Sequence, residues 1–500
     1  MSTARKLIRS SLWRNMELAV LLAVTFLMTP FIVHSLGNRM YGVWTLIGTF
    51  IGYYGLLDFG LSSAASRYIS QSLGRGDLED MNHVANTAFF LFSLVGLAAL
   101  LLTILAAAAC PVFIHNPEEV ALFRKIILLL GVATAVGFPV RVFGGVLNSY
   151  LRYDYLSGIS IARTLLSNTA IYYCLSRGGG IMAVTVISFV FSLLQNAGTY
   201  AASKAQCPHV RIAGFRYDRA KVRAMFNYSW KNFVCQVGDL LRFRIDSLMI
   251  AGFLEVSLVT PYTVGVRLVD GFSQVVGSSI GTMMPVFSQY EGRGDYDAIR
   301  SALLKVTTLS TLLCAFVGFS ILFYAKAFIL RWMGPGFDRS YYVTVILCIA
   351  SIVALPQSPG IQLLYGISKH GSYAVLNTCE AVLNVILSYV FLRYYGMYGV
   401  ALGTTAEMLI FKLFIQPVYI CRAVKLPVRT YLFDTILVTL LKAGTALGIY
   451  FYLIKGFVTP NYGRLCACAA VQVLFFIPVA YFFILSAADR DFVRTRLNIG

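Results

Sequence analysis

The sequence predicts an all-α polytopic membrane protein with about fourteen transmembrane helices, arranged as two parallel, pseudo-symmetric six-helix lobes followed by two C-terminal helices. Three observations lead to this prediction: the composition, the recurrence of long apolar runs and an internal repeat. Hydrophobic residues make up 58% of the 500 residues and charged residues only 13%, whereas a soluble domain carries about 25% charged residues. We therefore expect most of the chain to lie within a bilayer.

Apolar runs long enough to cross a bilayer recur along the whole chain. About 20 apolar residues are needed for one helical crossing, so each run predicts one transmembrane helix. The fourteen runs cover residues 13–36, 41–66, 84–110, 120–147, 154–175, 179–202, 226–252, 258–287, 302–325, 340–366, 372–394, 397–420, 430–454 and 464–486. An even number of crossings places both termini on the same side of the membrane.

The distribution of basic residues predicts which side that is. The formal net charge is +19, and the loops that share a side with the termini hold 23 Lys and Arg residues against ten in the opposite set. Such an excess marks cytoplasmic loops, so both termini are predicted to be cytoplasmic and nucleic acid is not an expected partner. No cleavage motif of small residues follows the first basic cluster, and the first apolar run is therefore predicted to be a signal anchor.

Cysteine and histidine usage gives no sign of metal or disulfide chemistry. The ten cysteines include no C-x-x-C pair and lie mostly within apolar runs, as expected of small buried residues. The five histidines are scattered, and no two of them share a helix at a spacing of three or four residues. We therefore predict no metal site and no cofactor.

An internal repeat divides the chain into two halves. The tetrapeptide GRGD occurs at residues 74–77 and again at 292–295, and further identical residues recur at the same offset of 218. Six crossings per half preserve orientation, so the two halves are predicted to be parallel repeats. The predicted organisation is an N-terminal lobe (1–205), a basic cytosolic linker (206–225), a C-terminal lobe (226–421), two extra transmembrane helices (430–487) and a cytosolic tail (488–500).

Three short motifs are interpreted as structural. In each GRGD copy the glycines are expected to bend the chain and the aspartate to cap the next helix. The D-x-D sequences Asp295–Asp297 and Asp489–Asp491 have the form of some metal-dependent glycosyltransferase motifs. They lie in short cytosolic segments, so we interpret them as acids at helix starts. Gly178–Gly180 is predicted to form a tight turn, because no strand precedes it.

The most informative stretch is residues 228–252, which is long enough to cross the bilayer but contains several charges. Lys231 and Arg242 fall on one helical face, and Asp239 and Asp246 flank Arg242 on nearly the same face. Charged residues at membrane depth usually face a bundle interior or a wet cavity. These residues are therefore predicted to line a water-accessible pathway, the alternative being that the acids and Arg242 neutralise one another in a structural network.

Other polar residues within the predicted spans extend this hypothesis. The further cavity candidates lie on the first two helices of each half, and they are Arg14, Arg67, Arg267 and Gln274. For Arg14 and Arg67 the alternative is that each side chain extends to the inner headgroups. The candidate ion-coupling residues are four carboxylates, Asp58, Asp270, Glu380 and Glu407. The alternative for Glu380, which lies between two asparagines, is a hydrogen-bonded packing role.

Several segments together resemble the polysaccharide flippases of the multidrug/oligosaccharidyl-lipid/polysaccharide exporter superfamily. Tyr41-Gly42 opens the second predicted helix, and Asp58-Phe59-Gly60-Leu61 closes it before a run of small residues and Arg67. IDSLMIAGFLEVSLVTPYTVGVRLVD is similar to the junction between helices 7 and 8 of that family, and Tyr394–Ala401 is similar to its turn before helix 12. The order and spacing of these segments carry the resemblance over almost the whole chain.

This resemblance implies a flippase that carries an oligosaccharide linked to undecaprenyl pyrophosphate across the bacterial inner membrane by alternating access. The cargo would be an O-antigen, capsule or exopolysaccharide repeat, and the other implied partners are membrane lipids, a polysaccharide polymerase and chain-length machinery. Lys231, Arg242 and Arg267 would contact the phosphates or acidic sugars, and Asp239 and Asp246 would orient those cations. No cofactor and no enzymatic activity are expected.

Two alternative functions follow from the same sequence. A cation-coupled multidrug exporter of the same superfamily would need a cavity dominated by carboxylates and aromatic residues, whereas predicted helices 7 and 8 carry four basic and three acidic residues. A membrane glycosyltransferase or polysaccharide polymerase would need a sizeable outer loop with catalytic groups, and the predicted outer loops are short.

Overall fold

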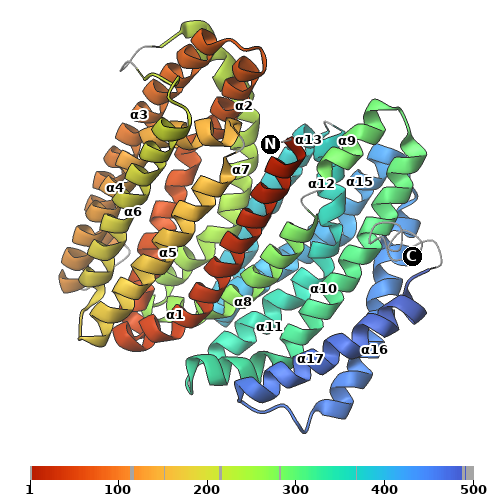
Figure 1. Ribbon diagram of the computed structural model, residues 1–500. Coiled ribbons are helices and arrows are strands. Elements are labelled where there is room, and N and C mark those ends of the chain that lie inside the picture. Colours follow the sequence, from red (N-terminus) through yellow and green to blue (C-terminus); the bar gives the residue numbers. More distant parts are fainter. Residues whose placement is uncertain are drawn as a thin grey trace. The chain divides into compact units, whose positions relative to one another are not determined.

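The computed structural model describes residues 3–112, 117–150, 152–212, 217–280, 283–367, 369–486 and 490, and this part of the chain forms helices and connecting turns without strands (Figure 1). It divides into two compact units, Met1–Thr260 and Pro261–Gly500. Within the described residues, ten helices are long and apolar enough to cross a membrane. Each of the fourteen predicted ranges lies mostly on helical segments, but the number of crossings stays a prediction.

The first unit contains long helices joined by short turns. Its elements are α1 (Thr3–Tyr53), the 3₁₀ segment η1 (Tyr54–Asp58), α2 (Leu61–Gly74), α3 (Leu78–Ala109), the 3₁₀ segment η2 (Cys110–Val112), α4 (Pro117–Ser149), α5 (Tyr153–Ser176), α6 (Ile181–Gln206), α7 (Arg219–Phe253) and the start of α8 (Val256–Ile280). Helix α4 packs against α2, α3 and α6, while α5 packs against α1 and α6 (Figure 1). Phe92, Phe138 and Val142 are fully buried in the core shared by α3 and α4.

Two breaks interrupt the helical path of the first seventy residues. Gly37 has φ 77° and ψ 161° inside α1, and this non-helical residue separates the first and second predicted crossings. The second break lies at residues 58–61, where the family resemblance places the end of the second helix, whereas the apolar run 41–66 alone predicted one helix. Phe59 (φ 48°) and Gly60 (φ 74°) are both left-handed, so this range divides into the end of α1, η1 and the start of α2.

The second unit is built around α10. Its elements are the remainder of α8, α9 (Met284–Gly292), α10 (Tyr296–Met333), α11 (Asp338–Ala354), the 3₁₀ segment η3 (Leu355–Gln357), α12 (Ser358–Gly366), α13 (His370–Tyr395), α14 (Met397–Ile410), the π segment η4 (Phe411–Ile415), α15 (Gln416–Val424), the π segment η5 (Arg429–Leu437), α16 (Val438–Ile454), α17 (Tyr462–Val479) and the π segment η6 (Ala480–Ile484). Helix α10 contacts α9, α11, α12 and α16, and α14 packs against α11 and α13.

The boundaries of corresponding elements recur at the offset of the sequence repeat. Helices α2 and α9 end 218 residues apart, α3 and α10 begin 218 residues apart, and α6 and α15 end 218 residues apart. This agreement supports two copies of one helical plan within the chain. The predicted lobe boundaries and the parallel arrangement of the lobes stay predictions.

The two GRGD turns have the predicted geometry. Gly76 and Gly294 adopt positive φ values of 73° and 68°, which suit glycine because it has no Cβ. Asp77 accepts a hydrogen bond from the backbone N–H of Asp80 at 2.8 Å, and Asp295 accepts the equivalent bond from Ala298 at 2.9 Å. Each aspartate therefore caps the following helix, as predicted.

The D-x-D sequence that includes Asp295 is also structural. Asp297 lies in the first turn of α10, and its carboxylate accepts a hydrogen bond from Arg300 at 2.6 Å. This sequence therefore consists of acids at a helix start, as predicted. Asp489 and Asp491, the acids of the other D-x-D sequence, lie outside the described residues.

Candidate functional site

The predicted cationic stripe lies on α7. This helix begins after Asp218, whose carboxylate accepts a hydrogen bond from the backbone N–H of Ala220 at 2.7 Å. The side chains of Lys231, Asp239 and Arg242 lie outside the described residues, so the stripe itself stays a prediction. Asp246 is described and is 8% exposed, which places a carboxylate in a buried environment on the same helix.

Helix α8 carries the second group of predicted cavity residues. Arg267 is half-buried, whereas Asp270 and Gln274 are exposed. Phe272 and Val276, on the other side of α8, are almost fully buried. The polar face predicted from the spacing is therefore the open face of α8, and the apolar face packs into the protein.

Asp58 and Arg141 form an ion pair inside the first unit. A guanidinium nitrogen of Arg141 lies 3.1 Å from Asp58 Oδ1, and the Ser62 hydroxyl donates to the same oxygen at 2.6 Å. The guanidinium group also lies 4.3 Å from the ring centroid of Phe138. Asp58 thus connects the break after η1 to α4, and Arg141 is a functional candidate that the sequence analysis missed.

Arg14 and Arg67 are both exposed. The Arg14 guanidinium lies over the ring of Tyr153 at 5.7 Å, as expected of a cation–π contact at the edge of the bundle. Exposure agrees with the alternative interpretation that these arginines extend toward lipid headgroups. Their predicted place in a cavity stays a prediction.

A buried polar network surrounds Glu380 in the second unit. The Lys412 ammonium lies 2.9 Å from Glu380 Oε1 and donates to Gln416 at 2.6 Å. The Gln416 amide donates to Gln357 at 3.3 Å. The side chains of Lys412 and Glu380 are only 4% and 2% exposed, so this network joins α13, η4, α15 and η3 inside the unit.

The position of Lys412 depends on a local change of helix geometry. It lies in the π segment η4, which precedes Pro417 near the start of α15. Proline has no backbone N–H to donate to the preceding turn, and π segments often occur where a helix carries a functional side chain. The wider turn places the Lys412 ammonium between Glu380 and Gln416.

Glu407 and Asn384 belong to a second buried polar group nearby. Asn384 donates a hydrogen bond to Thr404 at 3.0 Å, and this bond joins α13 to α14. Glu407 is fully buried on α14, one helical turn after Thr404. The predicted ion-coupling carboxylates Glu380 and Glu407 therefore both lie inside the second unit.

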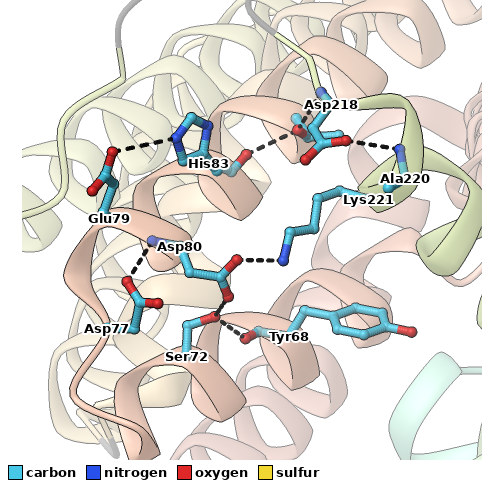
Figure 2. Close-up of polar contacts among 10 residues, drawn as sticks. Tyr68, Ser72, Asp77, Glu79, Asp80, His83, Asp218, Ala220 and Lys221 are labelled. Carbon is cyan, nitrogen blue, oxygen red and sulfur yellow. Dashed lines mark hydrogen bonds and ion pairs between the residues drawn. The ribbon is translucent and has the colours of Figure 1, made fainter.

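A third polar cluster lies at the start of α3, directly after the first GRGD turn. Figure 2 shows Asp80 between Lys221 and Ser72: Lys221 forms an ion pair with one Asp80 oxygen, and the Ser72 hydroxyl donates to the other at 2.6 Å. Ser72 also donates to the backbone carbonyl of Tyr68 at 3.0 Å. This Asp80–Lys221 cluster connects α2, α3 and α7.

Hydrogen bonds and a ring contact attach the segment between α6 and α7 to the first part of α3. Asn82 accepts a hydrogen bond from the backbone N–H of Arg211 at 2.7 Å, and Asn86 donates to the Arg211 carbonyl at 2.9 Å. Tyr217 stacks on Phe90 with ring centroids 4.8 Å apart. Burial raises the pKa of the Cys207 thiol to about 11, although the nearby Arg152 acts to lower it.

Sequence reasoning found the acids of these clusters more readily than their partners. Asp58 and Glu380 were candidates because carboxylates within apolar runs are conspicuous. The partner of Glu380 is Lys412, which lies in the apolar run 397–420. The signal for Arg141 was a cation deep within the apolar run 120–147, far from Arg124 and Lys125 near the start of that run.

The helical architecture, the apolar spans and the buried ion pairs define a polytopic membrane protein with charged residues inside its bundle. The sequence profile of the family described as "Polysaccharide biosynthesis protein" matches residues 36–341, more than half of the chain. The chain belongs to this family.

Two relatives match over most of their length. The chain is 23% identical over 408 residues to the "Uncharacterized membrane protein EpsK" of Bacillus subtilis (strain 168), covering 79% of each chain. It is 24% identical over 387 residues to the "Probable low-salt glycan biosynthesis flippase Agl15" of Haloferax volcanii, covering 76% of each chain.

Two solved structures share the fold. The "Lipid II flippase MurJ" in its inward closed conformation is 15% identical, with a TM-score of 0.75, and the match covers 97% of this chain and 100% of that chain. An inward-facing "multidrug resistance MATE family transporter of the MOP superfamily" is 14% identical, with a TM-score of 0.63, and covers 82% and 94%. The chain therefore shares its fold with these two transporters.

Proposed function

We propose that this chain is a flippase that moves an undecaprenyl-pyrophosphate-linked oligosaccharide, such as an O-antigen, capsule or exopolysaccharide repeat, across the bacterial inner membrane. Membership of a polysaccharide biosynthesis family supports the saccharide part of the cargo. The relative named as a probable glycan biosynthesis flippase and the fold shared with a lipid II flippase support the transport step.

The open polar face of α8 is the observation that supports an anionic headgroup on the proposed cargo. Arg267 lies on this face and is half-buried, and its neighbours Asp270 and Gln274 are exposed. A pyrophosphate loses its hydration when it enters a membrane, and fixed cations with hydrogen-bond donors can replace that hydration. We infer that Lys231 and Arg242 on α7 act with Arg267 on the phosphates, while Asp239 and Asp246 orient the cations.

Transport would proceed by alternating access. The polar faces of α7 and α8 would hold the headgroup in a wet cavity, the prenyl tail would stay in lipid, and the two halves would rock about the cavity. Both termini would be cytoplasmic. A polysaccharide polymerase and chain-length machinery would consume the delivered repeat on the outer side.

The four candidate ion-coupling carboxylates divide into two groups. Asp58 pairs with Arg141 and Glu380 pairs with Lys412, so each of these carboxylates has a cationic partner inside its own unit. These pairs favour structural roles for Asp58 and Glu380. Asp270, exposed on α8, and Glu407, buried on α14, stay candidates for coupling transport to an ion.

The proposal is tested by glycan export in a strain that lacks the chromosomal gene. We expect Lys231→Ala, Arg242→Ala and Arg267→Ala each to reduce surface polymer by roughly tenfold or more, because a hydrogen bond to a charged group contributes about 1.5–3 kcal/mol. The matched control is Lys326→Ala, which removes an exposed lysine of α10. Normal surface polymer at normal protein level in the three arginine and lysine variants would remove those residues from the site.

The two alternative functions give different outcomes in the same strain. A multidrug exporter, the activity suggested by the shared fold with a multidrug transporter, would change drug tolerance on deletion while surface polymer stayed normal. A glycosyltransferase or polymerase would change the structure or length of the glycan. A flippase instead leaves the completed lipid-linked repeat accumulated on the inner side, which mass spectrometry of extracted lipids can measure.

A further inference from the structure

A small groove opens on the second unit between α10, the helix formed by η5 and α16, and the end of η6. Its volume is about 350 Å³, near the lower end of the range for small-molecule sites. All three walls belong to helices long and apolar enough to cross a membrane: Tyr296–Met333, Arg429–Ile454 and Tyr462–Ile484. The groove therefore lies on a part of the protein that meets lipid.

The lining of this groove is polar and carries more positive than negative charge. Lys305 comes from α10 and Lys442 from α16, and a single carboxylate, Asp434, comes from η5. Hydroxyl groups of Thr308 and Thr439 also line it. Two ammonium groups in a polar groove form a suitable surface for one phosphate group.

The surroundings of the groove are apolar and open. Phe433 is 52% exposed, Leu441 is 61% exposed and Phe483 is 79% exposed, and these residues lie on the same helices as the groove lining. Exposed side chains of this kind on membrane-spanning helices are expected to contact acyl chains. Val438 lines the groove itself and is 39% exposed, so an apolar wall continues from the polar lining to the surface.

The depth of the lysines agrees with a headgroup site. Lys305 lies nine residues after the first residue of α10, which corresponds to about 14 Å along the helix axis. It thus lies on the half of the membrane that contains the start of α10, which the charge distribution predicts to be cytoplasmic. Basic pockets between transmembrane helices on that side are suited to anionic lipid headgroups.

We propose that this groove binds the phosphate of an anionic phospholipid from the cytoplasmic leaflet, with Lys305 and Lys442 as the cationic contacts. The acyl chains lie along the apolar surface near Val438 and Leu441. Asp434 limits the affinity, because its carboxylate repels the phosphate. This lipid is a resident ligand of the second unit and is distinct from the proposed transported cargo.

The test is native mass spectrometry of the purified full-length protein titrated with phosphatidylglycerol or phosphatidylcholine. The wild-type protein is expected to retain phosphatidylglycerol preferentially. Lys305→Gln and Lys442→Gln should each weaken this retention roughly fivefold, the effect of one lysine near an anionic lipid surface. Lys326→Gln, which changes an exposed lysine on the same helix α10, should retain wild-type binding.

A gain of binding provides a test that does not depend on the loss variants folding. Asp434→Asn should increase phosphatidylglycerol retention, because it removes the only carboxylate among the described residues of the lining. Equal retention of the two lipids by the wild-type protein would overturn the proposal, as would loss of phosphatidylglycerol in the presence of millimolar inorganic phosphate. None of these measurements requires transport, so their failure leaves the proposed flippase function unaffected.

Discussion

Lys412 is almost completely buried, and its ammonium group lies within hydrogen-bond distance of Glu380 and Gln416. Neither the lysine nor the glutamate would be stable alone in this environment, because an unpaired buried charge costs several kcal/mol. The two residues are 32 positions apart in the sequence. Their contact depends on the π segment η4, which changes the helical register, and a pattern based on 3.6 residues per turn cannot anticipate that change.

Replacing one partner of the Lys412–Glu380 pair should destabilise the protein more than replacing both partners. We expect Lys412→Met to lower the free energy of unfolding by about 3 kcal/mol or more, because Glu380 would keep an uncompensated charge. The double variant Lys412→Met/Glu380→Gln should recover most of this loss. Thermal unfolding of the purified protein in detergent measures the difference, with Lys326→Met as the exposed control. Equal melting temperatures for Lys412→Met and the control would contradict the structural role.

At the scale of elements, the two GRGD turns were predictable because glycine and aspartate have specific backbone uses. The helix break after η1 was not predictable from the apolar pattern, although the family resemblance ended the second helix at residues 58–61. Residues 54–60 are apolar enough to continue a helix, and phenylalanine is a residue type that rarely adopts the left-handed conformation found at Phe59. Asp58 is held by Arg141 and Ser62 at this position, and a contact between residues 83 positions apart carries no local sequence signal.

The positive φ values of the two turns predict the effect of adding a side chain. We expect Gly76→Ala and Gly294→Ala each to destabilise the protein by about 1 kcal/mol, the cost of a left-handed conformation for a residue with a Cβ. Among the described residues, no packing neighbour lies within 4 Å of the position that a Cβ would occupy at either glycine or at Gly292, whose φ is not positive. Gly292→Ala is therefore the matched control and should leave the melting temperature nearly unchanged. A similar loss for all three variants would rule out the backbone explanation.

For the whole molecule, composition and periodicity predicted an all-helical membrane protein, and the recurrence of element boundaries at an offset of 218 agrees with the sequence repeat. These features could be predicted from the sequence because burial in lipid imposes long apolar runs. The chemistry of the site was harder to predict. Charged residues within spans can be identified from the sequence, but their pairing depends on which helices meet, as the partners of Asp58 and Glu380 illustrate.

Reporter fusions can test the predicted orientation of the whole chain. Alkaline phosphatase needs disulfides and is active only outside the reducing cytoplasm. We expect it to be active when fused after Gly179, in the turn between α5 and α6, and inactive when fused after Gly500. A fluorescent protein at Gly500 should give the reciprocal result. Active phosphatase at the C-terminus with comparable expression would reverse the predicted topology.

The Asp80–Lys221 cluster is not repeated at the second GRGD turn, where Tyr290 and Ala298 stand at the repeat offset from Ser72 and Asp80. The second GRGD turn keeps the glycine geometry and the aspartate cap, but Ala298 occupies the place equivalent to Asp80 at the repeat offset. If both halves descend from one duplicated gene, their common ancestor already possessed the turn, since its backbone survives in both copies. Asp80 then distinguishes the first copy from the second, and this position could change during evolution without altering the GRGD turn.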